Sequence, residues 1–239
     1  MIDTHAHLGD DAGELLERAR AAGVTRVVEV ATTVAAARET LARAEREDGL
    51  YACLGVHPHE AGGPVDLDQL RELLAHPRAV AVGETGLDYF RDYAPHDEQQ
   101  RLFAELLELA RETDKPVVIH TRAADDHTLA KLRNFDGCVV LHCFSSPALL
   151  PHALERGWYV SFAGNVTYKN AYDLRAAARE VPHHLLLAET DSPYLAPQPV
   201  RGKRNEPAFV THTYDVLAQL HGDEIRTQIV ANAETVFGL

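Results

Sequence analysis

Eight short apolar segments of strand length recur along the chain, and helical patterns separate them. The segments are a first strand ending near His5, then Val24 to Val30, Leu50 to Val56, Ala79 to Val82, Pro116 to Ile119, Cys138 to Leu141, Trp158 to Phe162 and Leu185 to Ala188. Regular alternation of strand and helix is typical of parallel sheets, because each parallel connection needs a crossover. Eight such repeats predict a TIM-like (β/α)8 barrel.

An open doubly wound sheet is the structural alternative. That fold favours a glycine-rich phosphate loop after the first strand, and His5-Ala6-His7-Leu8-Gly9 is not one. The helices expected from apolar periodicity include Glu14 to Ala22, Val34 to Glu45, Asp97 to Glu112, Ala148 to Arg156, Tyr172 to Arg179 and two extra C-terminal helices, Ala208 to Leu220 and Asp223 to Phe237. Barrels of this length commonly form one domain, so we expect a single domain over residues 1–239.

The composition indicates a cytoplasmic protein. The three cysteines include no Cys-x-x-Cys pair, and the first residues lack the basic and apolar regions of a signal peptide. No apolar run approaches the ~18 residues that would suggest a membrane span. We therefore expect no membrane association, and no obligate protein partner is evident in the sequence.

Potential metal ligands follow the apolar segments along the whole chain. They are His5, His7, Glu84, His120, His142 and Asp191. Each alone could be a satisfied core or rim residue. In a parallel barrel, however, the carboxyl ends of all strands meet at one face, where such side chains would gather. The joint occurrence of imidazoles and carboxylates at these positions favours a metal site.

The number of ligands suits two divalent cations, with Mg, Mn and Zn all compatible with imidazole and carboxylate donors. Two such ions ~3.5 to 4 Å apart repel by on the order of 20 kcal/mol, so they need a bridging anion. Glu84 lies in the middle of the ligand order and is the natural bridge. A carboxylated lysine is the alternative, but Lys115, Lys131, Lys169 and Lys203 do not end strands.

The formal net charge of −13 excludes a broad basic surface of the kind that binds nucleic acid. Two dications would nevertheless make the site locally positive and attractive to phosphate. His57 could donate a hydrogen bond to a phosphate oxygen, or it could be a packing histidine beside His59. Other candidate substrate contacts are Arg122, Arg201, Arg204 and Tyr89, while Phe90, Phe144 and Tyr194 could either stack on bases or pack against loops.

Several longer motifs resemble the TatD-like metal-dependent hydrolases, many of which are deoxyribonucleases. They include Asp3-Thr4-His5-Ala6-His7-Leu8, Gly55-Val56-His57-Pro58-His59, Gly83-Glu84-Thr85-Gly86-Leu87-Asp88-Tyr89, His142-Cys143-Phe144-Ser145 and Glu189-Thr190-Asp191-Ser192-Pro193. The motifs run from end to end of the chain in order. The resemblance implies a TIM-like barrel with two divalent ions, one held by His5, His7, Glu84 and Asp191 and the other by Glu84, His120 and His142.

The function expected from this resemblance is hydrolysis of DNA phosphodiester bonds, from the 3′ end of single strands or duplex ends. Asp191, Glu84 and His57 are the expected catalytic residues. One alternative keeps the site but changes the bond to an ester, such as a D-aminoacyl-tRNA linkage, or to an amide. Another is a non-catalytic protein with structural metals, which is disfavoured because six ligands spread over two ions leave coordination positions open.

Overall fold

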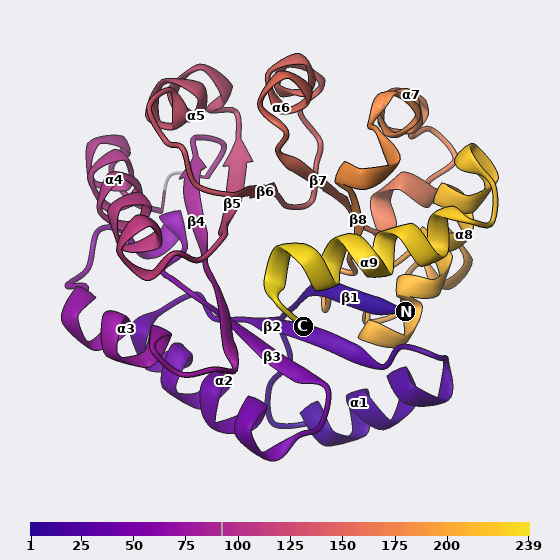
Figure 1. Cartoon of the computed structure of the whole chain (residues 1–239), viewed down its shortest axis with the longest axis horizontal. Coiled ribbons are helices and arrows are strands. Elements are labelled where there is room, and N and C mark those ends of the chain that lie inside the picture. Colours follow the sequence, from indigo (N-terminus) through magenta and orange to yellow (C-terminus); the bar gives the residue numbers. More distant parts are fainter. Residues whose placement is uncertain (92) are drawn as a thin grey trace. The chain divides into compact units, whose positions relative to one another are not determined.

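Eight parallel strands alternate with helices in the computed structural model, which describes residues 1–91 and 93–239 (Figure 1). The strands follow one another in the sheet in the order β1 to β8. They are β1 (Ile2–Ala6), β2 (Arg26–Val30), β3 (Leu50–Leu54), β4 (Ala79–Asp88), β5 (Val117–Arg122), β6 (Val139–Leu141), β7 (Tyr159–Phe162) and β8 (Leu186–Ala188). The expected TIM-like (β/α)8 fold is therefore confirmed.

The helices occupy the segments between strands, and two more follow β8. They are α1 (Ala12–Ala21), α2 (Val34–Arg46), α3 (Leu67–Leu74), α4 (His96–Thr113), α5 (Asp125–Leu132), α6 (Leu150–Arg156), α7 (Tyr172–Glu180), α8 (Val210–His221) and α9 (Ile225–Phe237). The expected helix from Ala148 begins as a 3-10 turn, η2 (Pro147–Leu149), and α6 starts only at Leu150. None of the helices in the described part of the chain has the length and apolarity needed to cross a membrane.

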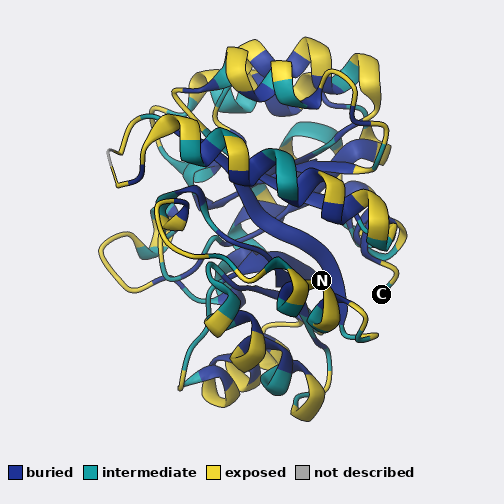
Figure 2. Cartoon of the chain, turned by 90° about the vertical axis from the view of Figure 1, so that its left-hand side faces the viewer, coloured by how far each residue is buried: buried dark blue, intermediate teal, exposed yellow. Residues whose placement is uncertain are grey.

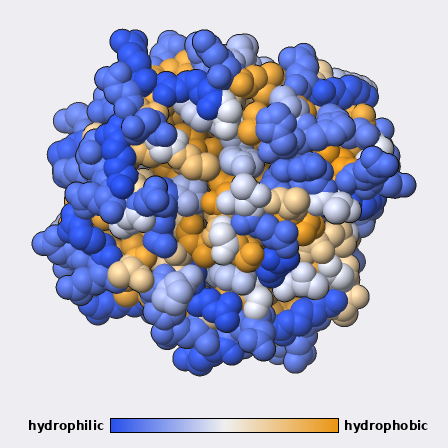
Figure 3. Space-filling view, in the orientation of Figure 1, coloured by the Kyte–Doolittle hydropathy of each residue, from blue (hydrophilic) through white to orange (hydrophobic). Residues whose placement is uncertain are grey.

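The chain divides into two compact units by its internal contacts. The first unit comprises Met1–Glu29 and His142–Leu239, and the second comprises Val30–Leu141. Both units bury their strands and expose the outer faces of their helices (Figure 2). Those outer faces are largely hydrophilic in the space-filling view (Figure 3). The single domain expected over residues 1–239 stays a prediction.

In the first unit, β1 is fixed to the segment that follows β8. Asp3 accepts hydrogen bonds from the backbone N–H and the hydroxyl of Thr190, at 2.8 and 2.6 Å. The N–H of His7 donates to the carbonyl of Ser192 at 2.7 Å, and α9 packs on both β8 and β1. These contacts hold the His5–His7 segment beside Asp191, whose own N–H donates to the His5 carbonyl at 2.9 Å.

In the second unit, β4 is longer than the sequence indicated. The apolar run Ala79 to Val82 was expected to end before Glu84, but the strand continues to Asp88 and pairs with β5 as far as Arg122. The register shifts between Val82 and Thr85, which hides the continuation from a periodicity argument. A Cβ on Gly86 would lie 2.0 Å from the carbonyl oxygen of His120, so only glycine permits this close pairing.

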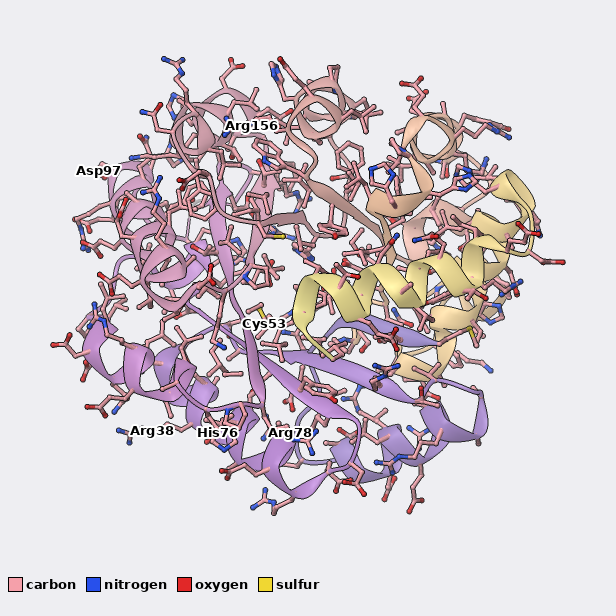
Figure 4. All side chains as sticks on the ribbon, in the orientation of Figure 1. Arg38, Cys53, His76, Arg78, Asp97 and Arg156 are labelled. Atoms are coloured by element: carbon pink, nitrogen blue, oxygen red, sulfur yellow. The ribbon has the colours of Figure 1, made fainter. Side chains whose placement is uncertain are left out.

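The neighbouring strand β3 contributes to the core of the same unit. Cys53, labelled in Figure 4, is fully buried within β3, and burial raises the pKa of its thiol. A buried neutral thiol packs as a small apolar side chain. Beyond β3, the chain turns at His57 into the 3-10 turn η1 (Pro58–Glu60). The end of β3 therefore delivers His57 and His59 to the same end of the unit as Asp88.

Tyr214 on α8 gives a test of how firmly β1 is held. Its buried hydroxyl donates to the carbonyl of Ile2 at 3.0 Å and lies 3.3 Å from the Ile2 N–H. Tyr214→Phe removes these partners from a fully buried backbone, so we expect the free energy of unfolding to fall by about 1–3 kcal/mol. Urea denaturation measures this. Tyr172→Phe, at a side chain that is 72% exposed, is the control and should change little.

Candidate metal centre

The first unit gathers three imidazoles and an aspartate beside one another. The Nε2 atoms of His5 and His7 lie 3.4 Å apart, and they are 3.9 and 3.7 Å from Oδ1 of Asp191. The ring of His142 stacks on that of His5 with centroids 4.0 Å apart. The structure thus brings together His5, His7, His142 and Asp191, four of the six ligands expected from the sequence.

The spacing of these atoms fits a shared cation. Bonds of ~2.0 to 2.1 Å from two imidazole nitrogens to a tetrahedral ion place those nitrogens roughly 3.4 Å apart. The His5 and His7 nitrogens already have this separation. Asp191 adopts a left-handed backbone conformation, with φ of 53°, which aspartate tolerates better than most residues. That conformation directs its carboxylate back toward the two histidines.

Glu189 is a buried carboxylate of this group that the sequence argument missed. Its Oε1 accepts the N–H of Cys143 at 2.7 Å and lies 3.2 Å from Nδ1 of His142. Its Oε2 is buried and has no hydrogen-bond partner within the described residues. Burial opposes ionisation, but the His142 imidazole and several hydrogen bonds outweigh it and hold the pKa of Glu189 below its ordinary value.

A buried, ionised glutamate beside imidazoles has two possible roles toward a metal. It can hold Nδ1–H of His142 so that Nε2 is presented to the ion, the common carboxylate–histidine arrangement at metal sites. Its second oxygen can also serve as a ligand, because one donor atom each of His5, His142 and Glu189 lies within 4.8 Å of the others. The one indication of Glu189 in the sequence was that it lies two residues before Asp191, on the same segment.

The second unit contains a separate group built from β3, β4 and β5. Nδ1 of His120 lies 2.8 Å from Oε1 of Glu84, and Nε2 of His57 lies 3.5 Å from the same oxygen. Glu84 is buried, with a relative exposure of 2%. A buried carboxylate with two imidazoles beside it is a suitable anchor for a divalent cation, and donor atoms of all three residues lie within 4.8 Å of one another.

The hydrogen bonds of His57 favour a donor rather than a ligand. The N–H of His59 donates to Nδ1 of His57 at 3.1 Å, so a neutral His57 ring carries its proton on Nε2. Burial lowers the pKa of His57 and outweighs the opposing effect of Glu84, which favours the neutral ring at pH 7. His57 therefore presents an N–H group, suited to an anionic oxygen, at the edge of the Glu84–His120 pair.

Asp88 orients the histidines of this group, and it too was missed from the sequence. Its Oδ2 lies 2.8 Å from Nε2 of His59 and 3.3 Å from Nε2 of His120. Its Oδ1 accepts the N–H groups of Phe90 and Arg91 at 2.9 and 3.0 Å. Burial is outweighed by these hydrogen bonds, which hold the pKa of Asp88 well below its usual range.

The contact between Asp88 and His120 bears on the tautomer of the His120 ring. Each ring nitrogen of His120 faces a carboxylate, Nδ1 that of Glu84 at 2.8 Å and Nε2 that of Asp88 at 3.3 Å, so an ion bound at Nδ1 would leave the ring proton on Nε2, directed at Asp88. The sequence signal was the spacing: residues four apart on a strand share a face, so Asp88 follows Glu84 on the same side of β4. The unexpected extension of β4 concealed this relation.

Among the expected substrate contacts in the second unit, Tyr89 follows Asp88 in the chain and Arg122 pairs with Asp88 in the register of β4 and β5. The ring of Tyr89 stacks on His96 with centroids 3.8 Å apart, and its hydroxyl lies 2.8 Å from Nδ1 of His127. Arg122 is exposed, with its guanidinium carbon 3.9 Å from the ring centroid of Phe90. One face of the Tyr89 ring is thus covered by His96 and one face of the Phe90 ring by Arg122, while the Phe90 side chain as a whole remains 62% exposed.

The residues of the first unit that were expected to contact substrate have different surroundings. The guanidinium of Arg201 lies over the ring of Tyr168 at 3.9 Å, whereas that of Arg204 forms an ion pair with Asp11. Tyr194 is exposed, with its ring centroid 6.2 Å from that of His7. Phe144 is buried and packs against Phe162, so of its two expected roles it has the packing one.

Comparison with known proteins identifies the family. Residues 2–238 match the family described as TatD related DNase. The chain belongs to this family. A Mycobacterium tuberculosis relative named uncharacterized metal-dependent hydrolase TatD is 40% identical over 260 residues, covering 100% of this chain and 98% of that one. The TatD motifs noted in the sequence are thereby confirmed as marks of a metal-dependent hydrolase.

Two further relatives cover nearly the whole chain. A Klebsiella pneumoniae protein named 3′-5′ ssDNA/RNA exonuclease TatD is 33% identical, covering 99% of this chain and 95% of its own length. The crystal structure of YJJV, a TatD homologue from Escherichia coli, superposes with a TM-score of 0.93 at 33% identity, covering 100% of this chain and 98% of that one. This TatD-family chain therefore has the complete fold of its solved relative.

The role of Asp88 in this TatD-family protein can be tested by Asp88→Asn. An asparagine oxygen can still accept the loop N–H groups, but its amide would donate to Nε2 of His120 and force the ring proton onto Nδ1. We expect metal affinity to fall by about 10- to 100-fold with the fold retained. Titration against a chelating indicator measures the affinity, and circular dichroism checks the fold.

Asp97→Asn is the matched control for this change. Asp97, labelled in Figure 4, is an exposed aspartate in the first turn of α4 and belongs to the same unit. Metal affinity should be unchanged in this variant. Equal metal affinities for Asp88→Asn and Asp97→Asn would show that Asp88 does not set the tautomer of a metal ligand.

Proposed function

We propose that this protein is a metal-dependent deoxyribonuclease that hydrolyses phosphodiester bonds from the 3′ end of single strands or duplex ends. The observation that carries the proposal is the pairing of buried carboxylates with imidazoles in each unit, His142–Glu189 in one and Glu84–His120 in the other. Such groups suit divalent ions, and phosphodiester hydrolysis commonly uses two of them. The Klebsiella relative's name, a 3′-5′ ssDNA/RNA exonuclease, supports this reaction class.

Our proposed ligand sets follow from the sequence and the family. One ion would be held by His5, His7, Glu84 and Asp191, and the other by Glu84, His120 and His142. Glu84 is the shared carboxylate, because two cations at close range require a bridging anion. The donor set suits Mg, Mn or Zn. This assignment rests on the strand-end argument of a parallel barrel.

Bound divalent ions would supply Lewis-acid stabilisation of phosphate oxygens and make water acidic enough to attack near neutral pH. The chain's own residues divide the remaining tasks. Asp191 is placed to accept a proton from the attacking water, because its carboxylate is partly exposed beside His5 and His7. His57 donates its Nε2–H to a phosphate oxygen, a role that its Nδ1 hydrogen bond prepares. Glu84 and His120 would hold an ion close to the phosphate that is cleaved.

The acidic composition limits where a nucleic acid can bind. A chain with formal charge −13 repels a polyanion over most of its surface, so attraction must come from the metal centre and a few nearby cations. An end or a short single strand can approach such a centre with few phosphate contacts. An internal duplex site would bring many more phosphates against acidic surface, which favours ends as the substrate.

The reaction can be tested with 3′- and 5′-labelled single-stranded DNA, duplex DNA and RNA. Chelated enzyme should be inactive, and adding back Mg, Mn or Zn should restore a product ladder that shortens from the 3′ end. A catalytic-site variant, Asp191→Asn, is the control against a contaminating nuclease. Hydrolysis of aminoacyl esters or amides without any DNA ladder would support the alternative bond, and metal binding without hydrolysis would support a structural role.

A contrast between two neighbouring residues tests the proposed roles. Glu84→Ala should reduce metal content from about two ions per chain to one or none, because the bridge offsets the repulsion between the ions. His57→Ala should retain full metal content while turnover falls, because its N–H contacts substrate. Elemental analysis and single-turnover rates measure the two effects. Two ions retained in Glu84→Ala would remove Glu84 from the bridge, and metal loss in His57→Ala would make His57 a ligand.

A further inference from the structure

The segment after β4 exposes two aromatic rings beside the Glu84–His120 group. Phe90 and Tyr93 are 62% and 64% exposed, and they are two of the four large hydrophobic side chains exposed in residues 1–91 and 93–239. Single exposed apolar side chains are common, whereas several gathered in one place are typical of a binding surface. The ring of Tyr93 contacts the edge of His59 with centroids 4.7 Å apart, so the exposed surface continues to the histidines held by Asp88.

Two arginines lie against these rings instead of against carboxylates. The guanidinium carbon of Arg122 is 3.9 Å from the Phe90 centroid, and that of Arg91 is 5.8 and 5.9 Å from the centroids of Phe90 and Tyr93. Neither forms an ion pair with a carboxylate of the described residues. In the same unit, by contrast, Arg71, Arg101 and Arg111 each contact two carboxylates.

The position of these rings is fixed to the catalytic group by one carboxylate. Oδ1 of Asp88 accepts the N–H groups of Phe90 and Arg91, while its Oδ2 faces His59 and His120. Gln99 in turn holds the Asp88 backbone, accepting its N–H at 2.9 Å and donating to its carbonyl at 3.1 Å. The start of the exposed segment therefore cannot shift without disturbing the orientation of His120.

We propose that Phe90, Tyr93, Arg91 and Arg122 form a platform that binds single-stranded nucleic acid, with bases stacked on the rings and phosphates at the guanidinium groups. Every base has a π-face, so such a surface binds without sequence preference. Base faces are hidden within a stacked duplex, which makes a single strand or a frayed end the matching ligand. The proposal rests on the nuclease function proposed above and adds the residues that would hold its substrate's bases.

The rings and the arginines act together in this arrangement. A guanidinium stacked on an aromatic face keeps its N–H groups free at the edges for phosphate oxygens. The positive charge of Arg91 and Arg122, which have no carboxylate partner among residues 1–91 and 93–239, is complementary to a polyanion, although the chain as a whole is acidic. An apolar partner protein would not require these charges, and a duplex would not require the rings.

The test uses a short single-stranded oligodeoxynucleotide with phosphorothioate linkages that resist cleavage and with 2-aminopurine at successive positions. Metal-loaded protein should quench the fluorescence at the position that stacks on Phe90. In Phe90→Leu, which keeps an apolar side chain without a π-face, quenching should disappear and the dissociation constant should rise about 10- to 100-fold. Phe90→Trp should retain both quenching and affinity.

Two controls separate stacking from general damage. The first control is Tyr51→Leu. Tyr51 lies near the start of β3, and its ring is in contact with the guanidinium of Arg78, which is labelled in Figure 4. This variant should bind the oligonucleotide as the unmodified protein does. An oligomer of abasic deoxyribose phosphate should bind Phe90→Leu and unmodified protein equally, because it has no base to stack. An equal loss of affinity for the abasic oligomer in Phe90→Leu would overturn the platform, because the substitution would then act through the fold or the charge and not through base stacking.

The outcomes also separate this inference from the nuclease proposal. Unchanged oligonucleotide affinity and quenching in Phe90→Leu would overturn the platform, even if end-labelled DNA is degraded. Equal affinity for duplex and single strand would overturn it too, because stacked bases cannot use the rings. If the unmodified protein binds no oligonucleotide, the platform is wrong, and the end-labelled product ladder decides the nuclease activity independently.

Discussion

The arrangement of both histidine groups depends on buried carboxylates that contact the imidazole nitrogens. Asp88 faces Nε2 of His120 and Glu189 faces Nδ1 of His142, so an ion at the other nitrogen of either ring would leave the ring proton on the side of that carboxylate. Neither carboxylate can be ionised in a dry interior without compensation. The backbone N–H groups of the following loop supply part of it for Asp88, and that of Cys143 for Glu189. Loop conformation and histidine orientation are thereby set by the same two carboxylates.

The fold was predictable because its signals are local and repeated. Eight apolar runs with helical patterns between them specify a (β/α)8 chain, and Gly157 ends α6 in the left-handed conformation expected of a helix C-terminus. The predicted end of β4 at Val82 was wrong, and the cause is equally local. Its second half, Thr85 to Asp88, is buried but partly polar, and a register shift separates it from the apolar first half. Hydrophobic periodicity cannot follow a strand across such a shift.

Residue types at strand ends pointed to His5, His7, Glu84, His120, His142 and Asp191, and the two groups of the structure include all of them. The residues that orient them could not be singled out in this way. Asp88 and Glu189 matter because they contact histidines distant in sequence, His59 and His120 for Asp88 and His142 for Glu189. An acidic residue near a strand end is otherwise commonplace. The proton on His57 was equally inaccessible, because it depends on a backbone N–H two residues ahead.

The distribution of arginines explains how an acidic chain could still select nucleic acid. Several guanidinium groups on the helices pair with carboxylates, as Arg101 does with Glu98 and Glu105. Such pairs add little stability, but they cancel positive charge that would otherwise attract any polyanion. Arg91 and Arg122 lie on rings and have no carboxylate partner in the described part of the chain, residues 1–91 and 93–239. For the proposed nuclease, repulsion over most of the surface and attraction at one place would exclude long duplex contacts and admit a single end.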